Sequence, residues 1–538
     1  MAAFNEEFRF GSARWAEPNE MRLLHRGSLY LGLDNEGRIL RHPSDGPALM
    51  VAGSGAGKAL TSIMYNACCY PGSMLVADFK GEIAAVSLAA QAAMGKYAYC
   101  VNPARLLPDF LPSHSTDPLD ILKRDTLALV PDAKMIAEML VPLSGSSNGK
   151  HFEETARLCL EALLVADVEK RGVGSLGNLY RIICAIEGDQ DKFLSILEAM
   201  GASGFEHVRS TAGTMFYKYR DAPKEWSGIA GEMRKSLSFL DDPSFLHALE
   251  SPSFSLSILC ERPCNVYINI PAEYIGIWSP YLRLLVGVAM LYKQRNPQRP
   301  RVVFLLDECG QLGHAEFLLR AMTFGRGAGI LCQAVFQDLG QIARHYGREG
   351  VQTFLGSAQV RQFFGVRDLE TAEMVSKMLG HETLSFDPDL DQAAARRNKA
   401  HIVRELLAGA DPFDAGLNYA QQARAAVDRR KMARFLMSAD EILRMPEDRQ
   451  ILFVSGVSCP PIAAYRKPYF LHRELAGRCL PNPYFGGGAH ARIMGRSRMK
   501  IARVITEPVP ESFAEYPQYA SGLWSYIEGY RPQLEKRQ

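Results

Sequence analysis

Eight short apolar runs recur along this 538-residue chain, and they constrain its fold more than any other feature. The runs read "ALMVA", "SMLVAD", "YAYCV", "CNVYINI", "VVFLLDE", "GILCQAV", "VRQFFGV" and "ILFVSG". They are rich in β-branched and aromatic residues, which is typical of strands that are buried on both faces. Because most of them are followed by a helical pattern, the sequence predicts an α/β fold with a mostly parallel sheet and helices on its faces.

A chain of this length is expected to form two or three domains. Between the third and fourth runs the pattern is helical for more than a hundred residues, as in "HFEETARLCLEALLVADV". We therefore expect an all-α domain at residues 117–250, inserted into an α/β domain made of residues 1–116 and 251–484. After the Gly triplet of "PNPYFGGGAHARIMGRSRMK", residues 485–538 are expected to form a basic tail.

The first strand runs into a glycine-rich turn and a lysine, "LMVAGSGAGKAL". In a phosphate loop the backbone N–H groups wrap the phosphates, the Lys reaches the outer two and a following hydroxyl binds Mg²⁺. Ala52 stands where the first Gly of the usual pattern belongs, and Ala59 removes the hydroxyl, so a glycine-rich turn with a chance lysine is the alternative. The predicted nucleotide-binding residues are Gly53, Ser54, Gly55, Ala56, Gly57, Lys58 and Ala59.

Two acids close the apolar run of "RVVFLLDECGQLG". Ligands of parallel α/β sheets bind at the carboxyl ends of the strands, where these acids are expected to lie. In a nucleotide-driven motor the first acid, here Asp307, holds Mg²⁺, and the second, Glu308, polarises the attacking water. Such a strand end is common by chance, but together with the phosphate loop it favours an ATPase.

A third polar turn follows the strand of "MLVADFKGEIA", with Asp78, Lys80 and Glu82. Acids are favoured in a first helical turn, so this segment is either a polar helix start or a part of the nucleotide site. The second alternative rests on the tendency of consecutive strands to be neighbours in the sheet.

In "GRGAGILCQAVFQDLGQI", an arginine between glycines precedes a strand with two glutamines. Arg326 is either a solvated surface charge or an arginine finger. Gln333 and Gln337 need polar partners, and a γ-phosphate or an attacking water is one candidate.

Composition and residue spacing exclude several other classes of protein. Hydrophobic residues make up 47% and charged residues 22%, as in soluble globular proteins, and the net charge of +2 leaves only a local patch or channel for nucleic acid. The eleven cysteines lack the spacing of a disulfide framework or of paired zinc ligands and are expected to be reduced core residues. No apolar run reaches the roughly 18 residues that span a bilayer, and the N-terminus does not read as a signal peptide.

The order of several motifs resembles the type IV secretion coupling proteins, the TraG-like family. The motifs run from "GSARWA" through "GSGAGK", "ADFKGE", "NVYINIPAEY", "LLDECGQLG", "GRGAGILCQAVFQDLGQI" and "FFGVRDLETAEMVS" to "SADEILRMPEDRQILFVSGVSCPPIAAYRKPYF". They cover most of the chain between Gly11 and Tyr484.

The resemblance implies a RecA-like P-loop ATPase domain with an inserted all-α domain, assembled as a homo-hexamer. Such motors use ATP and Mg²⁺ to hand DNA with its attached relaxase and relaxosome proteins, or effector proteins, to a type IV secretion channel. The implied partners include the channel ATPases and inner-membrane components, at the cytoplasmic face of the bacterial inner membrane. By the same resemblance Lys58 binds phosphate, Asp307 serves Mg²⁺ and Glu308 the water. Arg326 reaches the neighbouring subunit's nucleotide and Gln337 acts as sensor.

Two features depart from the family pattern. A pair of transmembrane helices usually precedes "GSARWA", whereas ten residues precede Gly11 here and no transmembrane segment is expected. The chain is therefore truncated, docked by a separate membrane protein, or part of a soluble subgroup. Ala59 lacks the hydroxyl, and Thr61 lies two residues too late to replace it.

Two basic segments, "AAARRNKAHIVRE" and "ARAAVDRRKMAR", either contact DNA phosphates or are solvated helix faces. Three functions remain open. The leading one is an ATP-driven coupling protein with DNA-stimulated hydrolysis. The others are a catalytically weak P-loop scaffold that recruits substrates to the channel, and a cytosolic hexameric DNA translocase.

Overall fold

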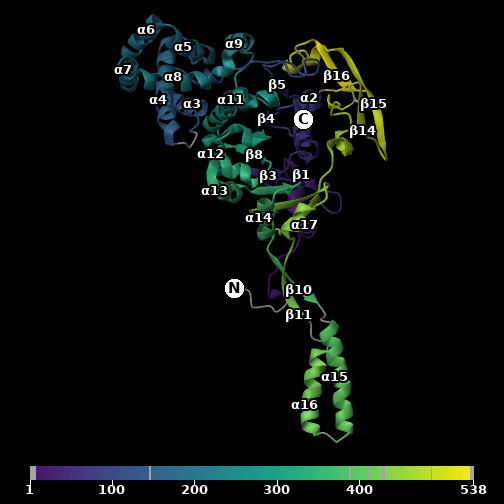
Figure 1. The fold of residues 1–538 in the computed structure, drawn as a ribbon. Helices are drawn as coiled ribbons and strands as arrows, with labels where there is room; N and C mark the ends of the chain where they lie inside the picture. The colour runs from purple at the N-terminus through teal and green to yellow at the C-terminus, as the bar shows by residue number, and fades with distance from the viewer. Residues whose placement is uncertain are drawn as a thin grey trace.

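The computed structural model describes residues 8–143, 147–386, 389–409, 411–426, 430–485 and 488–533. At its centre lies an eleven-stranded sheet in the order β2-β1-β13-β12-β9-β3-β8-β7-β4-β6-β5 (Figure 1). From β9 onward the neighbours pair in parallel: β9 (Val360–Phe364), β3 (Ala48–Ala52), β8 (Ile330–Phe336), β7 (Val302–Leu306), β4 (Ser73–Ala77), β6 (Cys264–Ile268) and β5 (Tyr97–Val101). This arrangement confirms the predicted α/β fold, and these strands coincide with the first seven apolar runs.

The remaining strands extend the sheet with antiparallel pairs. They are β12 (Arg449–Val454), β13 (Ile462–Tyr465), β1 (Tyr30–Leu33) and β2 (Ile39–Arg41). Of these the sequence predicts β12 alone, because the others are only three or four residues long and lack a continuous apolar run.

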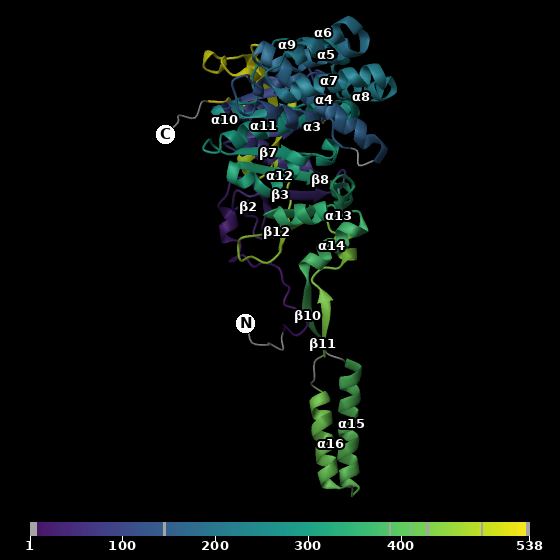
Figure 2. The ribbon, with the colours of Figure 1, turned by 90° about the vertical axis from the view of Figure 1, so that its left-hand side faces the viewer.

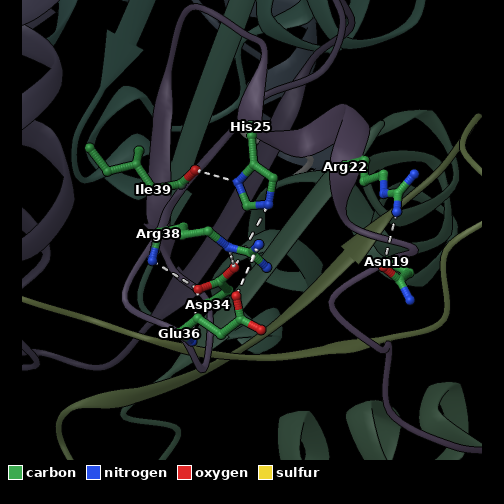
Figure 3. Close-up of polar contacts among 7 residues, drawn as sticks. All are labelled: Asn19, Arg22, His25, Asp34, Glu36, Arg38 and Ile39. Atoms are coloured by element: carbon green, nitrogen blue, oxygen red, sulfur yellow. Dashed lines mark hydrogen bonds and ion pairs between the residues drawn. The ribbon is translucent and has the colours of Figure 1, made fainter.

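The turn between β1 and β2 is built around one buried carboxylate (Figure 3). Asp34 accepts hydrogen bonds from the Arg38 backbone N–H at 2.8 Å, from Arg38 Nε at 2.8 Å and from the Glu36 N–H. His25 contacts the same carboxylate and also the Ile39 carbonyl. Burial acts to raise the pKa of Asp34, but the hydrogen bonds from Arg38 outweigh it and leave that pKa below its ordinary value.

Helices cover both faces of the parallel strands, which explains why these strands are apolar throughout. Along β4, Met74 and Val76 pack toward α1 (Met64–Cys69) and α2 (Glu82–Ala93), while Leu75 packs toward the opposite face. The helices around that face are α10 (Ile258–Glu261), α11 (Ile275–Arg295), α12 (Glu316–Phe324), α13 (Leu339–Ser357), α14 (Leu369–Leu379) and α17 (Ala439–Leu443).

A layer of helices lies between β5 and β6 in the chain and packs beside α11 (Figure 1). It comprises α3 (Leu129–Leu140), α4 (Ser147–Arg171), α5 (Leu176–Gly188), α6 (Gln190–Gly201), α7 (Glu206–Asp221), α8 (Pro223–Ser236) and α9 (Pro243–Glu250). This is the all-α insertion that the sequence predicts. Within the described chain, one helix, Ala272–Arg295, has the length and apolarity of a membrane span, and 78% of its apolar window is buried inside the protein.

A helical hairpin stands apart from the body on a two-stranded stalk (Figure 2). The stalk pairs β10 (His381–Phe386) with β11 (Arg430–Phe435), and the hairpin consists of α15 (Asp389–Leu407) and α16 (Pro412–Ala425). The first basic segment lies on α15 and the second on α16 and β11, with residues 427–429 outside the described residues. The start of the described chain runs along the stalk, where the Ala13 N–H donates to the His381 carbonyl at 2.9 Å.

The segment expected to be a basic tail contains a three-stranded sheet of β14 (His490–Met494), β15 (Met499–Pro508) and β16 (Leu523–Ile527). Its basic residues alternate with apolar ones, so that Arg492 is exposed while Ala491 and Ile493 are buried. This period-two pattern lets a sequence rich in arginine form strands with one buried face.

Candidate nucleotide-binding site

The glycine-rich loop connects β3 to a helix, as a phosphate loop does. Lys58 immediately precedes the first helical turn, Ala59–Ile63, which continues into α1. Gly57 has a φ of 75°, a conformation that other residues rarely adopt. At Gly53 a Cβ would lie 2.5 Å from the Gly365 carbonyl oxygen, so only glycine allows β9 to approach the loop this closely.

Three predicted site residues meet beside this loop. Lys58 Nζ lies 2.7 Å from Glu308 Oε1, and the other oxygen of the same carboxylate accepts a 2.8 Å hydrogen bond from Gln337 Nε2. Lys58 follows β3, Glu308 follows β7 and Gln337 follows β8, all at carboxyl ends of parallel strands. Glu308 is therefore held between a cation and an amide donor.

The backbone at the acidic strand end is unusual. Glu308 has a φ of 55°, the left-handed region that non-glycine residues rarely occupy, and its N–H donates to Asp307 Oδ1 at 3.1 Å. Such a conformation costs of order 1–3 kcal/mol and persists where the surroundings fix it, most often at functional sites. Burial raises the pKa of Asp307 to about 6.

The polar turn of Asp78, Lys80 and Glu82 also borders the site. The neighbour argument for this placement was wrong, because β8 and β7 lie between β3 and β4. The turn nevertheless lines the same cavity as the loop, because the carboxyl ends of all these parallel strands lie at one edge of the sheet. Asp78 is buried, accepts from the Ala84 N–H at 2.8 Å, and has a pKa raised to about 7 by burial.

One cavity of about 1190 Å³ joins these groups. On the sheet side it is lined by Ser54, Gly55, Gly57, Lys58, Ala59, Asp78, Phe79, Lys80, Glu82, Asp307, Glu308 and Gln337. Much of the remaining lining comes from residues far along the chain, within 469–485 and 490–501. A cation, backbone N–H donors and carboxylates that converge in one cavity match a site for a polyphosphate with a divalent cation.

Arg326 lies away from this cavity. It is exposed in the Gly325–Ala328 turn, which precedes β8, whereas Gln337 follows β8. At about 3.3 Å per residue the seven residues of β8 separate the two ends by roughly 23 Å. The structure therefore does not bring Arg326 to the Lys58 of its own chain. Gln333 lies in the middle of β8, and within the described residues its Oε1 has no hydrogen-bond partner.

Sequence reasoning missed one residue of this site, Arg466, which follows β13. Its guanidinium donates to the Ala56 carbonyl of the loop and, at 2.8 Å, to the Thr61 hydroxyl, and it lies 3.6 Å above the Phe364 ring. Arg466 is buried, which lowers its pKa to about 10, and no carboxylate among the described residues forms an ion pair with it. Arg466 therefore places a positive charge next to the phosphate loop, which favours an anionic ligand there.

Thr61 does not replace the hydroxyl that Ala59 lacks. Its Oγ1 donates to the Gly57 carbonyl at 2.9 Å and accepts from Arg466. The Thr61 side chain therefore stabilises the loop backbone through these two hydrogen bonds. Lys58, the Ser54 hydroxyl and the backbone N–H groups of the loop are the donors that can reach the phosphates.

A family model described as type IV secretory system conjugative DNA transfer matches residues 22–400. Similar proteins include the type IV secretion system-coupling protein VirD4 of Bartonella quintana, which is 24% identical over 81% of this chain and 64% of its own length. The probable conjugal transfer protein TraG of Sinorhizobium fredii is 23% identical over 79% of this chain and 62% of its own. The chain thus spans less than two thirds of the length of these relatives.

Among solved structures, the bacterial conjugative coupling protein TrwBdeltaN70 aligns with a TM-score of 0.60 and 16% identity. The alignment covers 86% of this chain and 96% of that one. TrwB has also been solved with ADP and Mg²⁺ and with the ATP analogue ADPNP, each with a TM-score of 0.58. These likenesses establish the fold.

Proposed function

The chain belongs to the type IV secretory system conjugative DNA transfer family, and from that premise we propose that it is an ATP-driven coupling protein. It recruits DNA with its relaxase and relaxosome proteins, or effector proteins, and feeds them to a type IV secretion channel. The single observation that carries this proposal is the Lys58–Glu308–Gln337 cluster at the rim of one polyphosphate-sized cavity.

The residues present fit ATP and Mg²⁺. The glycine loop offers backbone N–H groups, Lys58 a cation, and Asp307 a buried carboxylate at the adjoining strand end. When bound, Mg²⁺ neutralises the charge that develops on the outer phosphates. Related solved structures support this choice, since TrwB has been solved with ADP and Mg²⁺ and with an ATP analogue.

Each residue has one role in the proposed hydrolysis. Lys58 leaves Glu308 and binds the outer phosphates, which releases a carboxylate oxygen of Glu308. That oxygen accepts a hydrogen bond from the attacking water and holds it in line with the γ-phosphorus. Gln337 keeps its contact with the other oxygen of Glu308. Through this contact the presence or loss of the γ-phosphate is transmitted to the end of β8.

Arg326 completes the site of a neighbouring subunit. It is exposed, and it lies at the opposite end of β8 from the site of its own chain, so a trans role is the one that its position supports. An arginine finger stabilises negative charge on the transferred phosphoryl group. We therefore propose that the working unit is a homo-hexamer at the cytoplasmic face of the inner membrane, beside the channel ATPases and inner-membrane components.

The decisive experiment measures ATP turnover with and without single-stranded and duplex DNA. The coupling protein is expected to hydrolyse ATP faster with DNA and to leave a tailed duplex unseparated when it acts alone. A cytosolic hexameric translocase with helicase function would separate that duplex unaided.

Ala59 favours a second candidate, a catalytically weak scaffold that recruits substrates to the channel. Without a hydroxyl at this position, Asp307 would hold the metal together with water. The scaffold predicts nucleotide binding with no turnover under any DNA condition, which the same experiment detects.

A further inference from the structure

The nucleotide cavity has two chemically different walls. The sheet side carries Lys58 and the carboxylates. Opposite them lies a stretch that we call the cap segment, residues 469–484. Five aromatic residues line the cavity, and four of them belong to or directly follow the cap segment: Phe79, Tyr469, Phe470, Tyr484 and Phe485.

The cap segment is fixed to the nucleotide domain by specific bonds. The Leu480 N–H donates to the Val86 carbonyl of α2 at 2.9 Å, and Asn482 Nδ2 donates to Glu82 Oε2 at 2.7 Å. The Tyr484 hydroxyl donates to the Lys80 carbonyl at 2.9 Å. The cap segment is therefore hydrogen-bonded to Lys80 and Glu82, which belong to the polar turn that lines the same cavity as Lys58.

Apolar packing attaches the beginning of the cap to the helix that follows the loop. Tyr469 and Leu475 are buried in one cluster with Met64 and Cys68 of α1, and Ala59 and Phe470 pack against it. The Sγ atoms of Cys68 and Cys479 lie 3.0 Å apart. The aromatic wall is thus held at a fixed place relative to the phosphate loop.

We propose that the aromatic base of the nucleotide stacks on the cap segment, with Phe470 and Tyr484 as the residues that hold the base. The inference rests on the proposed nucleotide site and adds the residues that contact the base. Phosphates bound at Lys58 leave the base within the same continuous cavity, whose volume exceeds that of common small-molecule pockets. Phe470 is partly exposed to it and Tyr484 is 51% exposed, so both rings have surface left for stacking.

The test compares two diphosphate ligands that differ in the base, ADP and inorganic pyrophosphate, each with Mg²⁺. Calorimetric titration of the full chain is expected to show that the wild type binds ADP more tightly. Phe470→Leu and Tyr484→Ala are expected to weaken ADP binding about tenfold, the loss typical of one base–aromatic stack, and to leave pyrophosphate binding within about twofold.

Two controls make the result specific. Tyr484→Phe keeps the ring without the hydroxyl and is expected to keep ADP affinity, while Tyr217→Ala removes an exposed ring of α7 far from the cavity. Phe470 also packs against the α1 cluster, so Tyr484→Ala, at an exposed position, separates stacking from stability.

The outcomes are distinct. Equal losses for ADP and pyrophosphate, or no loss of ADP binding in either cap variant, would overturn the base-stacking role while leaving the phosphate site intact. A wild type that binds neither ligand, or a Lys58→Ala variant that binds both as the wild type does, would overturn the nucleotide site on which it rests.

Discussion

Lys58 and Glu308 form an ion pair on the sheet side of the cavity, with 2.7 Å between Nζ and Oε1, although both are expected to act on a nucleotide. Any phosphate that binds Lys58 competes with Glu308 for the same ammonium group. The pair therefore couples phosphate binding to the release of the carboxylate that positions the water.

Replacing Glu308 by Gln removes the competitor of the phosphates and one negative charge beside them. Glu308→Gln is expected to bind ATP several-fold more tightly than the wild type and to lose at least about 100-fold in turnover, the usual scale for a general base. Equilibrium binding and steady-state hydrolysis measure the two effects. Glu316→Gln, an exposed acid on α12, is the control, and a Glu308→Gln enzyme with normal turnover would refute the role.

Among the described residues, the Gln337 side chain donates to Glu308 and makes no hydrogen bond to the phosphate loop, so its loss acts on the orientation of Glu308. Gln337→Ala is expected to lower kcat about 10- to 100-fold with nucleotide affinity nearly unchanged. Pre-steady-state kinetics separate the two quantities. A variant that loses affinity and keeps kcat would assign Gln337 to binding instead.

Arg326 acts on another subunit if the proposed assembly is correct. Arg326→Ala and Lys58→Ala are each expected to abolish turnover, and their mixtures are expected to regain part of it at interfaces that pair an intact Lys58 with an intact Arg326. Titrating one variant into the other measures this. An absence of recovery at every ratio argues against the trans role.

Arg466 stabilises the phosphate loop through Ala56 and Thr61. Arg466→Ala leaves these groups without their donor, which costs about 1–3 kcal/mol for a buried polar group, so ADP and pyrophosphate affinity are expected to fall together about tenfold. Arg466→Lys is expected to restore part of the loss.

Arg283 supplies a matched control for that prediction. It is also buried, its pKa is lowered to about 10 by burial, and it donates to the Met139 carbonyl at 2.7 Å. Arg283→Ala is expected to lower thermal stability without changing nucleotide affinity. If both arginine variants change affinity equally, Arg466 has only a general structural role.

Asp34 makes stability depend on pH. Because its pKa is lowered in the folded chain, its ionised form contributes stability above the unfolded pKa of about 4, and this contribution is lost as the pH falls through the folded value. Asp34→Asn, which cannot form an ion pair with Arg38, is expected to lower the free energy of unfolding at pH 7 by roughly 1 kcal/mol. A thermal melt at each pH measures the accompanying fall in the midpoint. The difference from the wild type should shrink below about pH 4, and a constant difference across that range would contradict the account.

The sequence predicted the parallel sheet well because its strands are covered on both faces and therefore read as unbroken apolar runs. It did not predict β13 or β14. In β13 only alternate residues are buried, and in β14 the exposed Arg492 between the buried Ala491 and Ile493 breaks the apolar run and makes the segment resemble a basic tail.

The candidate site was predictable where a polar side chain follows an apolar strand closely in the sequence, as with Lys58, Asp307, Glu308 and Gln337. Arg466 was not, because its partner Ala56 lies 410 residues away in the chain and only the pairing of β13 with β12 and β1 in the central sheet brings them together. The cap segment was hidden for the same reason, since Tyr484 and Lys80 are 404 residues apart.

The central claim is that the Lys58–Glu308 cluster drives ATP hydrolysis coupled to DNA. The most direct test is the rate of ATP hydrolysis by the full chain, with and without single-stranded DNA, for the wild type, Lys58→Ala and Glu308→Gln. The wild-type rate is expected to rise with DNA, and the rates of both variants are expected to fall to background. Hydrolysis that persists unchanged in both variants would contradict the central claim.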